Sequence, residues 1–376
     1  MGVLEHAIDA NPQANKRFII RDGDLVELPH NFLSFLFGSF LSPLGKLRLL
    51  LEPFIAKGNL DGNESVAEFI TRRLGREVLE YCVNPFIGGI YASKPENLSL
   101  AHAFPTLFEM EKNKRSIFLG SMNLRKNANR ISKSRLISFP NGMAELIHLI
   151  SSKISGEVTV EQKVTAIHKL DDGWKIISQS KDRSKVEGIY DEVICTLPAH
   201  CLLEIDWLGI GCRENLKVLA SALNYPINLV YLGYDEAQVK TPLDGFGFLA
   251  PEKENLNILG SLFSSTLFPG RAPPGKILLT TFIGGERKPE LTELDDFQTF
   301  NLAIEDLSKL LRITGSPEFK SIKRWKQGIP LPDLKMGERK KAARAIERNN
   351  RGLSFSGSHL TGVSLPNCLQ GNYSNF

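Results

Sequence analysis

The chain has 376 residues, enough for two domains with a sizeable core. Hydrophobic residues make up 42% and charged residues 23% of it, which excludes a disordered chain, a collagen-like chain and a small disulfide scaffold. Lysine and arginine number 46 against 42 acidic residues, so the net charge of +4 gives no general electrostatic case for binding nucleic acid. Phenylalanine accounts for 22 residues, a surplus that suits an apolar ligand cavity or a lipid-facing surface as well as a core.

Cysteine and histidine usage argues against metal sites, disulfides and secretion. The five cysteines include no C-x-x-C pair, and no two of the seven histidines have the spacing of metal ligands. The first residues, MGVLEHAIDANPQANKRF, lack the apolar stretch and the small-residue cleavage site of a signal peptide. We therefore expect a cytoplasmic protein without a resident metal.

Strand and helix patterns divide the chain into three tracts. Arg17–Leu28 alternates apolar and polar residues around an Asp-Gly pair, which predicts a β-hairpin. From Asn31 to about Asn129 the pattern is helical, and Ser65–Tyr81 places its apolar residues three and four positions apart, as one face of a helix requires. From Ile137 onward the pattern changes to strands, with a later helix near 295–311.

The expected fold class is α+β, because the helical tract is inserted into a sheet-rich body. Alternation across an Asp-Gly turn makes VTVEQKVTAIHKLDDGWKIISQ a half-buried antiparallel hairpin. Further short strands are expected at DEVICTLPA (191–199), INLVYLGY (227–234), GFGFLAP (245–251), ILGSLFSS (258–265) and ILLTTFIGG (277–285).

One apolar segment, Phe32–Pro53, leaves two interpretations open. Pro43 and Gly45 interrupt it, and the charges of Lys46 and Arg48 follow, so it is too short to span a membrane as a helix. It fits a buried helical hairpin. It equally fits an amphipathic segment lying in a membrane interface, with its basic residues near anionic lipid headgroups.

Five longer strings point to one enzyme family. They are YCVNPFIGGIYASKPENLSLAHAFPTLFEMEKNKRSIFLG (81–120), SFPNGMAELI (138–147), DEVICTLPA (191–199), LGSLFSSTLFPGRAPPGKILLTTFIGGER (259–287) and FSGSHLTGVSLPNC (355–368). In this order and spacing they resemble the oxygen-dependent protoporphyrinogen oxidases, FAD-containing enzymes of the flavin amine oxidase superfamily. The match runs from Arg17 to Cys368. No Ser-His-Asp arrangement, H-E-x-x-H motif or P-loop points to another class.

The resemblance implies both an architecture and a reaction. It implies an FAD-linked, substrate-binding body at 1–28 and 130–376, with an α/β FAD-binding remnant, a mixed or antiparallel sheet and a closing loop at 355–368. A helical domain at 29–129 would bind the membrane and line the substrate cavity. The implied reaction is the six-electron oxidation of protoporphyrinogen IX to protoporphyrin IX in haem biosynthesis, with FAD reoxidised by oxygen. The implied partner is the inner face of the membrane, bound peripherally, and the oligomeric state is left open, a homodimer being one alternative.

The resemblance also assigns substrate-binding residues. Arg17 matches the arginine that pairs with a substrate propionate, and a guanidinium is a permanent, bidentate partner for a carboxylate. Phe263 matches the aromatic residue that stacks on a pyrrole ring, and Phe246 the apolar residue on the opposing ring face. Val230 matches another lining position. Gly89 matches a place where backbone approaches the substrate, although a tight helix–loop turn explains it equally well. The flavin does the chemistry, so no catalytic side chain is expected.

The cofactor residues follow in the same way. Val164 matches the strand whose backbone meets the adenine, and Thr196 and Pro198 match the segment that passes the dinucleotide. Trp325 matches the strand beside the isoalloxazine. The closing loop, where glycines let backbone reach the flavin, is matched by Gly357, Gly362 and Val363.

The sequence departs from the family at two features of FAD binding. No strand with G-x-G-x-x-G and a helix precedes Arg17, and the text after Cys368 is too short for the family's last helix. We therefore expect this chain by itself to purify without the yellow colour of flavin, which leaves an inactive chain as one of the alternatives. Three alternatives stay open: a protoporphyrinogen oxidase, an oxidase of coproporphyrinogen III, whose four propionates need more cations, and a flavin-free porphyrin-binding fragment. The string FSSTLFPGRAP favours the first.

Overall fold

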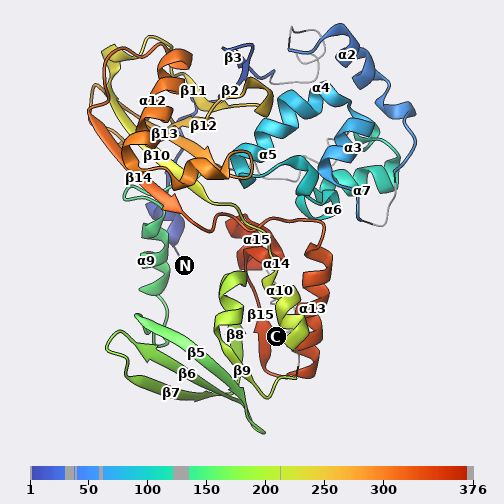
Figure 1. Cartoon of the computed structure of the whole chain (residues 1–376), viewed down its shortest axis with the longest axis vertical. Coiled ribbons are helices and arrows are strands. Elements are labelled where there is room, and N and C mark those ends of the chain that lie inside the picture. Colours follow the sequence, from blue (N-terminus) through green and yellow to red (C-terminus); the bar gives the residue numbers. More distant parts are fainter. Residues whose placement is uncertain are drawn as a thin grey trace. The chain divides into compact units, whose positions relative to one another are not determined.

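The structure is a computed structural model that describes residues 2–29, 38, 40–58, 62–121, 135–211 and 213–370. The chain forms two compact units, each built from several segments (Figure 1). The first unit comprises Met1–Asn97, Thr106–Ile154 and Tyr225–Gly328, and the second comprises Leu98–Pro105, Ser155–Asn224 and Ile329–Phe376.

A seven-stranded mixed sheet is the centre of the first unit. Its strands, in spatial order, are β14 (Phe319–Trp325), β10 (Ile227–Asp235), β13 (Lys276–Gly284), β12 (Ile258–Phe263), β11 (Gly245–Leu249), β2 (Lys16–Arg21) and β3 (Asp24–Glu27). All neighbours run antiparallel except β11 and β2, which run parallel. The hairpin predicted from its Asp-Gly turn is confirmed as β2 and β3, and it forms one edge of this sheet.

One face of the sheet forms the core of the unit and is covered by helix α12 (Asp296–Leu311) (Figure 1). Because side chains alternate along a strand, the register places Leu232, Leu279 and Phe263 side by side on this face. They pack with the buried side of α12 in one cluster. The side chain of Asp295 caps the first turn of that helix, which fixes where it begins.

The opposite face of the sheet carries helix α5 (Asn84–Tyr91), which packs against β11 and β12. Leu229 and Tyr231 of β10 point to this side, and so do Phe282 of β13, opposite Leu229, and Leu262 of β12. All four side chains are half-buried, in contrast to the buried side chains of the α12 face. We call Leu229, Tyr231, Leu262 and Phe282 the apolar floor.

Short helices and two short strands complete the first unit. They are η1 (Val3–His6), β1 (Ile8–Asp9), α2 (Pro43–Leu50), η2 (Glu52–Phe54), α3 (Val66–Arg73), α4 (Arg76–Val78), the π-helix η3 (Leu79–Val83), η4 (Pro95–Asn97), α7 (Pro105–Lys114), β4 (Ile137–Ser138), α9 (Ala144–Ser151), η7 (Glu236–Gln238), η8 (Glu252–Glu254), α11 (Ser264–Leu267) and η9 (Pro289–Glu293). The helix expected at 65–81 begins at a capping box of Ser65 and Glu68. Gly75 interrupts it, and a π-helical turn follows.

The second unit contains two smaller sheets. The first sheet has the order β7 (Lys185–Tyr190), β6 (Trp174–Ser180), β5 (Gln162–Lys169) and β9 (Asp206–Leu208), and the second pairs β8 (Val193–Cys195) with β15 (Leu353–Phe355) in parallel. Its helices are α6 (Leu100–Ala103), η6 (Ala199–Glu204), α10 (Arg213–Ala220), α13 (Met336–Asn349), α14 (Ser358–Thr361) and α15 (Leu365–Gln370). Trp174, Leu219 and Phe355 are among the side chains that fill its core.

The mixed helix-and-sheet fold that the sequence predicts is confirmed. The helices of the tract 29–129 do not form a compact unit of their own, because most of them group with the seven-stranded sheet, and the predicted functional boundaries stay a prediction. Of the segment 32–53, residues 32–37 and 39 lie outside the described residues, and helix α2 occupies its later part. Within the described ranges, no helix combines the length and the apolarity needed to cross a bilayer.

Candidate active site

Arg17 of β2 and Phe246 of β11 meet on the side of the sheet that carries the apolar floor. Phe18 pairs with Phe248, and both face the α12 core, so the preceding Arg17 points to the opposite side. The register between β2 and β11 shifts after Gly245, which gives β11 one extra residue opposite Arg17. The guanidinium carbon of Arg17 lies 5.6 Å from the centroid of the Phe246 ring, a cation–π distance.

The guanidinium of Arg17 is available to a ligand anion. The residue is exposed, and it forms no ion pair with any residue that the structure describes. Its neighbours differ, because Arg21 on the same side donates to Glu77 at 3.0 Å and Lys16 on the other side pairs with Asp244. A guanidinium without a carboxylate partner beside an aromatic ring is suited to bind the carboxylate of a flat ligand.

Gly89 lies inside α5, at a place where the helix is close to the sheet. A Cβ atom at Gly89 would overlap Cδ2 of Leu249, and a Cβ atom at the preceding Gly88 would overlap the guanidinium of Arg287. Helix–sheet packing therefore explains the two glycines, and Gly89 lies within the helix rather than in the tight helix–loop turn that was its alternative explanation. The approach of its backbone to a substrate stays a prediction. Leu249 is on the same side of the sheet as the apolar floor. It follows Gly247 by two residues on β11, and Gly247 is paired with Leu262 of the floor.

Val230 and Phe263 face the other side of the sheet. Both side chains are 0% exposed and belong to the cluster that packs with α12. The Phe263 ring lies 6.4 Å from the Phe18 ring and 6.3 Å from the Phe248 ring. The structure thus does not bring Val230 and Phe263 to the side on which Arg17 and Phe246 meet, because the alternation of β10 and β12 points them into the core. Their contact with a substrate stays a prediction.

The sequence interpretation missed the side chains of the apolar floor. Leu229 and Tyr231 flank Val230 on the same strand, and Leu262 directly precedes Phe263. The alternating pattern places the residues of the apolar floor and their neighbours Val230 and Phe263 on opposite faces of the sheet. It does not indicate which of the two faces packs against α12. Burial raises the pKa of the Tyr231 hydroxyl, in keeping with its apolar surroundings.

The residues assigned to the cofactor lie mainly in the second unit, at the ends of two parallel strands. Strands β8 and β15 are paired from Val193 to Cys195, so Thr196 and Gly357 follow at the same edge. The N–H of Ser356 donates to the carbonyl oxygen of Cys195 at 3.0 Å, which keeps these two ends together. Ligands of α/β folds bind at such carboxyl ends of parallel strands.

The closing loop has the backbone geometry of a close approach. Gly357 has a φ of 142° and Gly362 a φ of 110°, values that favour glycine, and the two residues flank helix α14. Val363 follows, half-buried. Between the glycines, the imidazole of His359 is buried, and its Nε2 has no hydrogen-bond partner in the described structure. Burial, with a smaller contribution from Arg339, lowers the pKa of His359 to about 4, so this ring is neutral near pH 7.

A cavity of about 620 Å³ adjoins these strand ends in the second unit. Val164 lines it together with Leu197, the residue between Thr196 and Pro198. The carboxamide of Gln162 lines the same cavity. In this cavity the apolar side chains of Val164 and Leu197 stand among polar and charged ones, a mixture that fits a nucleotide. The strand ends with their glycines fit a dinucleotide chain, so these residues fit FAD.

The remaining cofactor residue, Trp325, lies in the first unit. It is the last residue of β14 and is half exposed, with Nζ of Lys323 5.1 Å from its ring centroid. In the parts of the chain that the structure describes, no three His, Cys, Asp or Glu side chains are grouped as a metal site.

Comparisons with known proteins identify the family. A model of the flavin containing amine oxidoreductases matches residues 4–371. The mitochondrial protoporphyrinogen oxidase of Nicotiana tabacum is 33% identical, over 94% of this chain and 76% of that protein. The coproporphyrinogen III oxidase of Bacillus subtilis is 27% identical, over 97% of this chain and 79% of that protein. Among solved structures, a protein of Exiguobacterium sp. 255-15, assigned provisionally as a protoporphyrinogen oxidase, has a TM-score of 0.77 at 20% identity, covering 98% of this chain and 80% of its own.

Proposed function

Because the chain belongs to the flavin-containing amine oxidoreductase family, we propose that it oxidises protoporphyrinogen IX to protoporphyrin IX, with FAD as cofactor and molecular oxygen as final electron acceptor. The observation that carries this proposal is the contact between Arg17 and Phe246 beside the apolar floor. A flat macrocycle with apolar rings and carboxylate tails is complementary to an apolar surface that ends in a free guanidinium.

The side chains have separate roles in this arrangement. Arg17 binds a propionate, and the rings of Phe246 and Phe282 offer flat contacts to the pyrroles. Leu229 and Leu262 exclude water from the covered side of the macrocycle. The electron-accepting chemistry is supplied by FAD when it is bound, and Thr196 and the closing loop are the parts of this chain suited to hold it.

The experiment that tests the proposal compares protoporphyrinogen IX, coproporphyrinogen III and a primary amine as substrates, with excess FAD in air. Protoporphyrinogen IX should become fluorescent protoporphyrin faster with the protein than without it, and a primary amine should be left unchanged. Oxidation of the amine in place of the porphyrinogen would identify an amine oxidase. Saturable porphyrin binding without oxidation of any substrate would identify the flavin-free porphyrin-binding fragment.

Coproporphyrinogen III is the second candidate substrate, since a relative named for that activity matches nearly the whole chain. Its four propionates require several cationic partners. On β2 and β11, the described cations other than Arg17 are Lys16 and Arg21, and both are already paired with carboxylates. We therefore expect a higher kcat/KM for protoporphyrinogen IX, and a higher value for coproporphyrinogen III would reverse the assignment.

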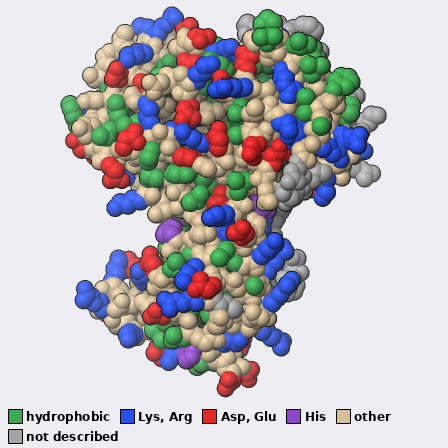
Figure 2. All heavy atoms as spheres, turned by 45° about the vertical axis from the view of Figure 1, so that its right-hand side comes forward, with side chains coloured by type: hydrophobic (Ala, Val, Ile, Leu, Met, Phe, Trp, Pro, Cys, Tyr) green, Lys and Arg blue, Asp and Glu red, His purple; other side chains and the backbone are tan. Residues whose placement is uncertain are grey.

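We also propose that the protein attaches peripherally to a membrane, at its cytoplasmic inner face, through α2 and η2. The side chains on one edge of this segment are three or four residues apart and exposed: Leu44, Leu47, Leu51 and Phe54. We call these four residues the leucine edge. Leu44 is 78% and Phe54 84% exposed, and Figure 2 shows hydrophobic side chains gathered in this part of the surface. An exposed apolar edge with nearby lysines, Lys46 and Lys57, is typical of a helix that lies in a membrane interface.

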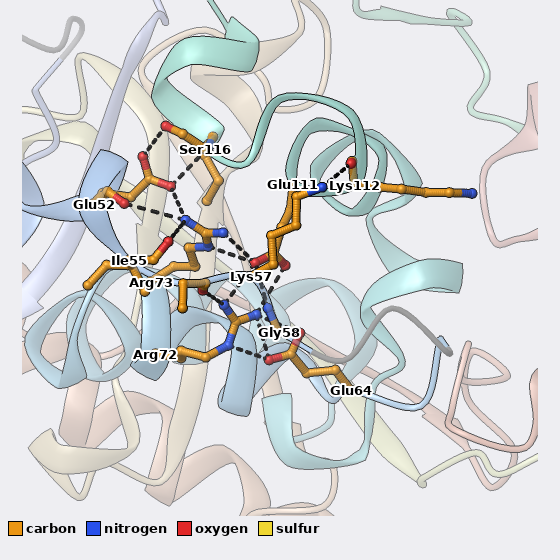
Figure 3. Close-up of polar contacts among 12 residues, drawn as sticks. Glu52, Ile55, Lys57, Gly58, Glu64, Arg72, Arg73, Glu111, Lys112 and Ser116 are labelled. Atoms are coloured by element: carbon orange, nitrogen blue, oxygen red, sulfur yellow. Dashed lines mark hydrogen bonds and ion pairs between the residues drawn. The ribbon is translucent and has the colours of Figure 1, made fainter.

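A buried ionic cluster supports the leucine edge (Figure 3). Arg73 of α3 is 0% exposed, and its guanidinium donates to Glu52 at 3.1 Å and to Glu111 of α7 at 2.5 Å and 2.9 Å. Glu52 accepts further hydrogen bonds from the hydroxyl of Ser116 at 2.5 Å and from the next two backbone N–H groups. Because Glu52 belongs to η2, the cluster fixes the segment that carries the leucine edge to the helices behind it.

The membrane proposal is tested by sedimentation with vesicles that contain anionic lipid. Leu47→Glu should lower the partition coefficient for the vesicles about tenfold or more, because burying one leucine contributes about 1.5–3 kcal/mol. Ile189→Glu is the matched control, since Ile189 is 72% exposed on β7 of the second unit. Equal binding of Leu47→Glu and the wild type would refute the leucine edge as the membrane contact.

A further inference from the structure

Two consecutive charged residues after β13 hold helix α5 at both of its ends. At the first end, Arg287 Nη2 donates to the carbonyl oxygen of Asn84 at 2.7 Å and to its side-chain Oδ1 at 2.8 Å. Arg287 Nη1 donates to the carbonyl oxygen of Ala250, directly after β11, at 2.6 Å. One guanidinium thus joins the start of the helix to the end of the strand.

At the other end of α5, Glu286 makes the corresponding contacts. Its carboxylate accepts hydrogen bonds from the hydroxyl of Ser93 at 2.7 Å, from the backbone N–H of Lys94 at 2.8 Å and from the side-chain amide of Asn97. Its own backbone N–H donates to the carbonyl oxygen of Ala92, the residue that ends the helix, at 2.7 Å. Glu286 and Arg287 together therefore fix both ends of an eight-residue helix.

The packing under α5 is close. Gly88 and Gly89 leave no room for a side chain between the helix and the sheet, since Arg287 and Leu249 occupy that space. Residues Phe86 and Ile90 flank Gly89 on the helix and are partly exposed. The close approach and the contacts at both ends thus fix the position of α5 on the side of the sheet that carries the apolar floor.

The chemistry of Arg287 fits a positioning role better than a stabilising one. Burial lowers the pKa of Arg287 to about 10, its hydrogen-bond acceptors are neutral oxygens, and its Nε is buried without a partner. A largely buried cation held by neutral groups is costly, and an apolar residue of similar size would often serve stability as well. An apolar residue could not, however, donate the hydrogen bonds that link Asn84 to Ala250.

We propose that Glu286 and Arg287 are positioning residues of the porphyrinogen site: by clamping α5, they set the distance between that helix and the apolar floor, and so the affinity for the macrocycle. The proposal rests on the proposed function, because it takes the apolar floor as the substrate surface. Neither residue touches the reacting atoms; they act through the position of α5.

The experiment compares Arg287→Met, which keeps the length of the side chain but removes its hydrogen bonds, with Glu286→Gln and the wild type. Lys288→Met is the matched control, because Lys288 donates hydrogen bonds to Asn255 and Asn257 and, in the described structure, forms none with α5. Two readouts need no turnover: hydrogen exchange of residues 84–91, and fluorescence titration with protoporphyrin IX. Arg287→Met should raise exchange in α5 and weaken porphyrin binding about tenfold, the loss of roughly one net hydrogen bond to a charged group. Glu286→Gln should do the same to a smaller extent, and the control should do neither.

The outcomes separate the clamp from the proposed function. Unchanged exchange in both variants would show that α5 is not clamped. Raised exchange with unchanged porphyrin affinity would show that the clamp does not position the substrate. If the wild type itself binds no porphyrin, the proposed function is wrong, and positioning of a porphyrinogen is wrong with it. If Arg287→Met does not fold, Glu286→Gln decides by the same two readouts.

Discussion

Replacement of Arg17 by alanine tests whether the apolar floor ends in the group that recognises the substrate carboxylate. Arg17 is exposed and pairs with no described carboxylate, so its removal costs the fold little beyond the contact with Phe246. A hydrogen bond to a charged group contributes about 1.5–3 kcal/mol, and exposure to water favours the lower end of that range. We therefore expect Arg17→Ala to bind protoporphyrin IX about tenfold more weakly, since about 1.4 kcal/mol corresponds to a factor of ten.

The assay is a fluorescence titration with two ligands, protoporphyrin IX and its dimethyl ester. The ester lacks the free carboxylates, so the wild type should bind it about as weakly as Arg17→Ala binds the free acid, and the substitution should add no further loss. Lys16→Ala is the matched control, because it removes the same charge from the other side of the same strand. Arg17→Lys should be intermediate, since an ammonium keeps the charge and loses the bidentate fork.

Two results would refute this reasoning. The first is equal affinity of the wild type and Arg17→Ala for the free acid. The second is an equal loss for acid and ester, which would mean that Arg17 contributes by packing on Phe246 rather than by binding a carboxylate.

Three further predictions concern stability and pH. Gly89→Ala should lower Tm, because overpacking costs about 1–3 kcal/mol and the new methyl group would overlap Leu249; adding Leu249→Ala should restore part of the loss, and a thermal melt with no change would contradict the close packing. Burial opposes ionisation of Glu111, but hydrogen bonds from Arg72 and Arg73 lower its pKa to about 2, below the ordinary value of 4.5. The ionised Glu111 carboxylate therefore stabilises the fold fully above its unfolded-state pKa, and this contribution is lost as the pH falls toward its folded-state pKa. In urea unfolding, the stability of Glu111→Gln should fall less with acid than that of the wild type. Burial and Arg339 lower the pKa of His359 to about 4 from 6.5, so the neutral form is favoured in the folded state and stability falls as the pH drops below about 6.5; an unchanged pH profile in His359→Gln would contradict this.

The sequence predicts those features that depend on a few neighbouring residues. The β2–β3 hairpin follows from Asp22 and Gly23, both with positive φ as a two-residue turn requires. Helix α12 begins at the Asp295 cap, close to where its periodicity predicts. In each case the local chain contains the whole physical cause, so no distant contact is needed.

Features that depend on distant pairing could not be predicted from the pattern. The parallel pairing of β2 with β11 joins residues more than 200 positions apart, and it alone brings Arg17 to Phe246. Arg17 and Phe246 were predicted as substrate-binding residues from the family resemblance, not from the alternating pattern of the strands. For the same reason, the sequence could not show that Val230 and Phe263 point into the core. The face of the sheet on which α12 packs is set only when the strands have assembled.

The contacts of Glu286 and Arg287 with α5 could not be predicted from the sequence for a related reason. Glu286 and Arg287 stand in the string FIGGER, where their charges indicate only a solvated loop. Their acceptors and donors, from Asn84 to Asn97, become neighbours when the helix packs on β11 and β12.

The central claim, that the porphyrin binds on the Arg17 side of the seven-stranded sheet, is tested most directly by photo-oxidation. Illuminated protoporphyrin IX oxidises nearby tyrosines, and strand β10 offers Tyr231 on the apolar floor and Tyr234 in the α12 core. Mass spectrometry should find Tyr231 oxidised and Tyr234 intact in the wild-type complex. Tyr231 should be oxidised less in Arg17→Ala, and less in the wild type when an equal amount of a non-binding dye replaces the porphyrin. Oxidation concentrated at other sites, with Tyr231 unmodified, would contradict the account.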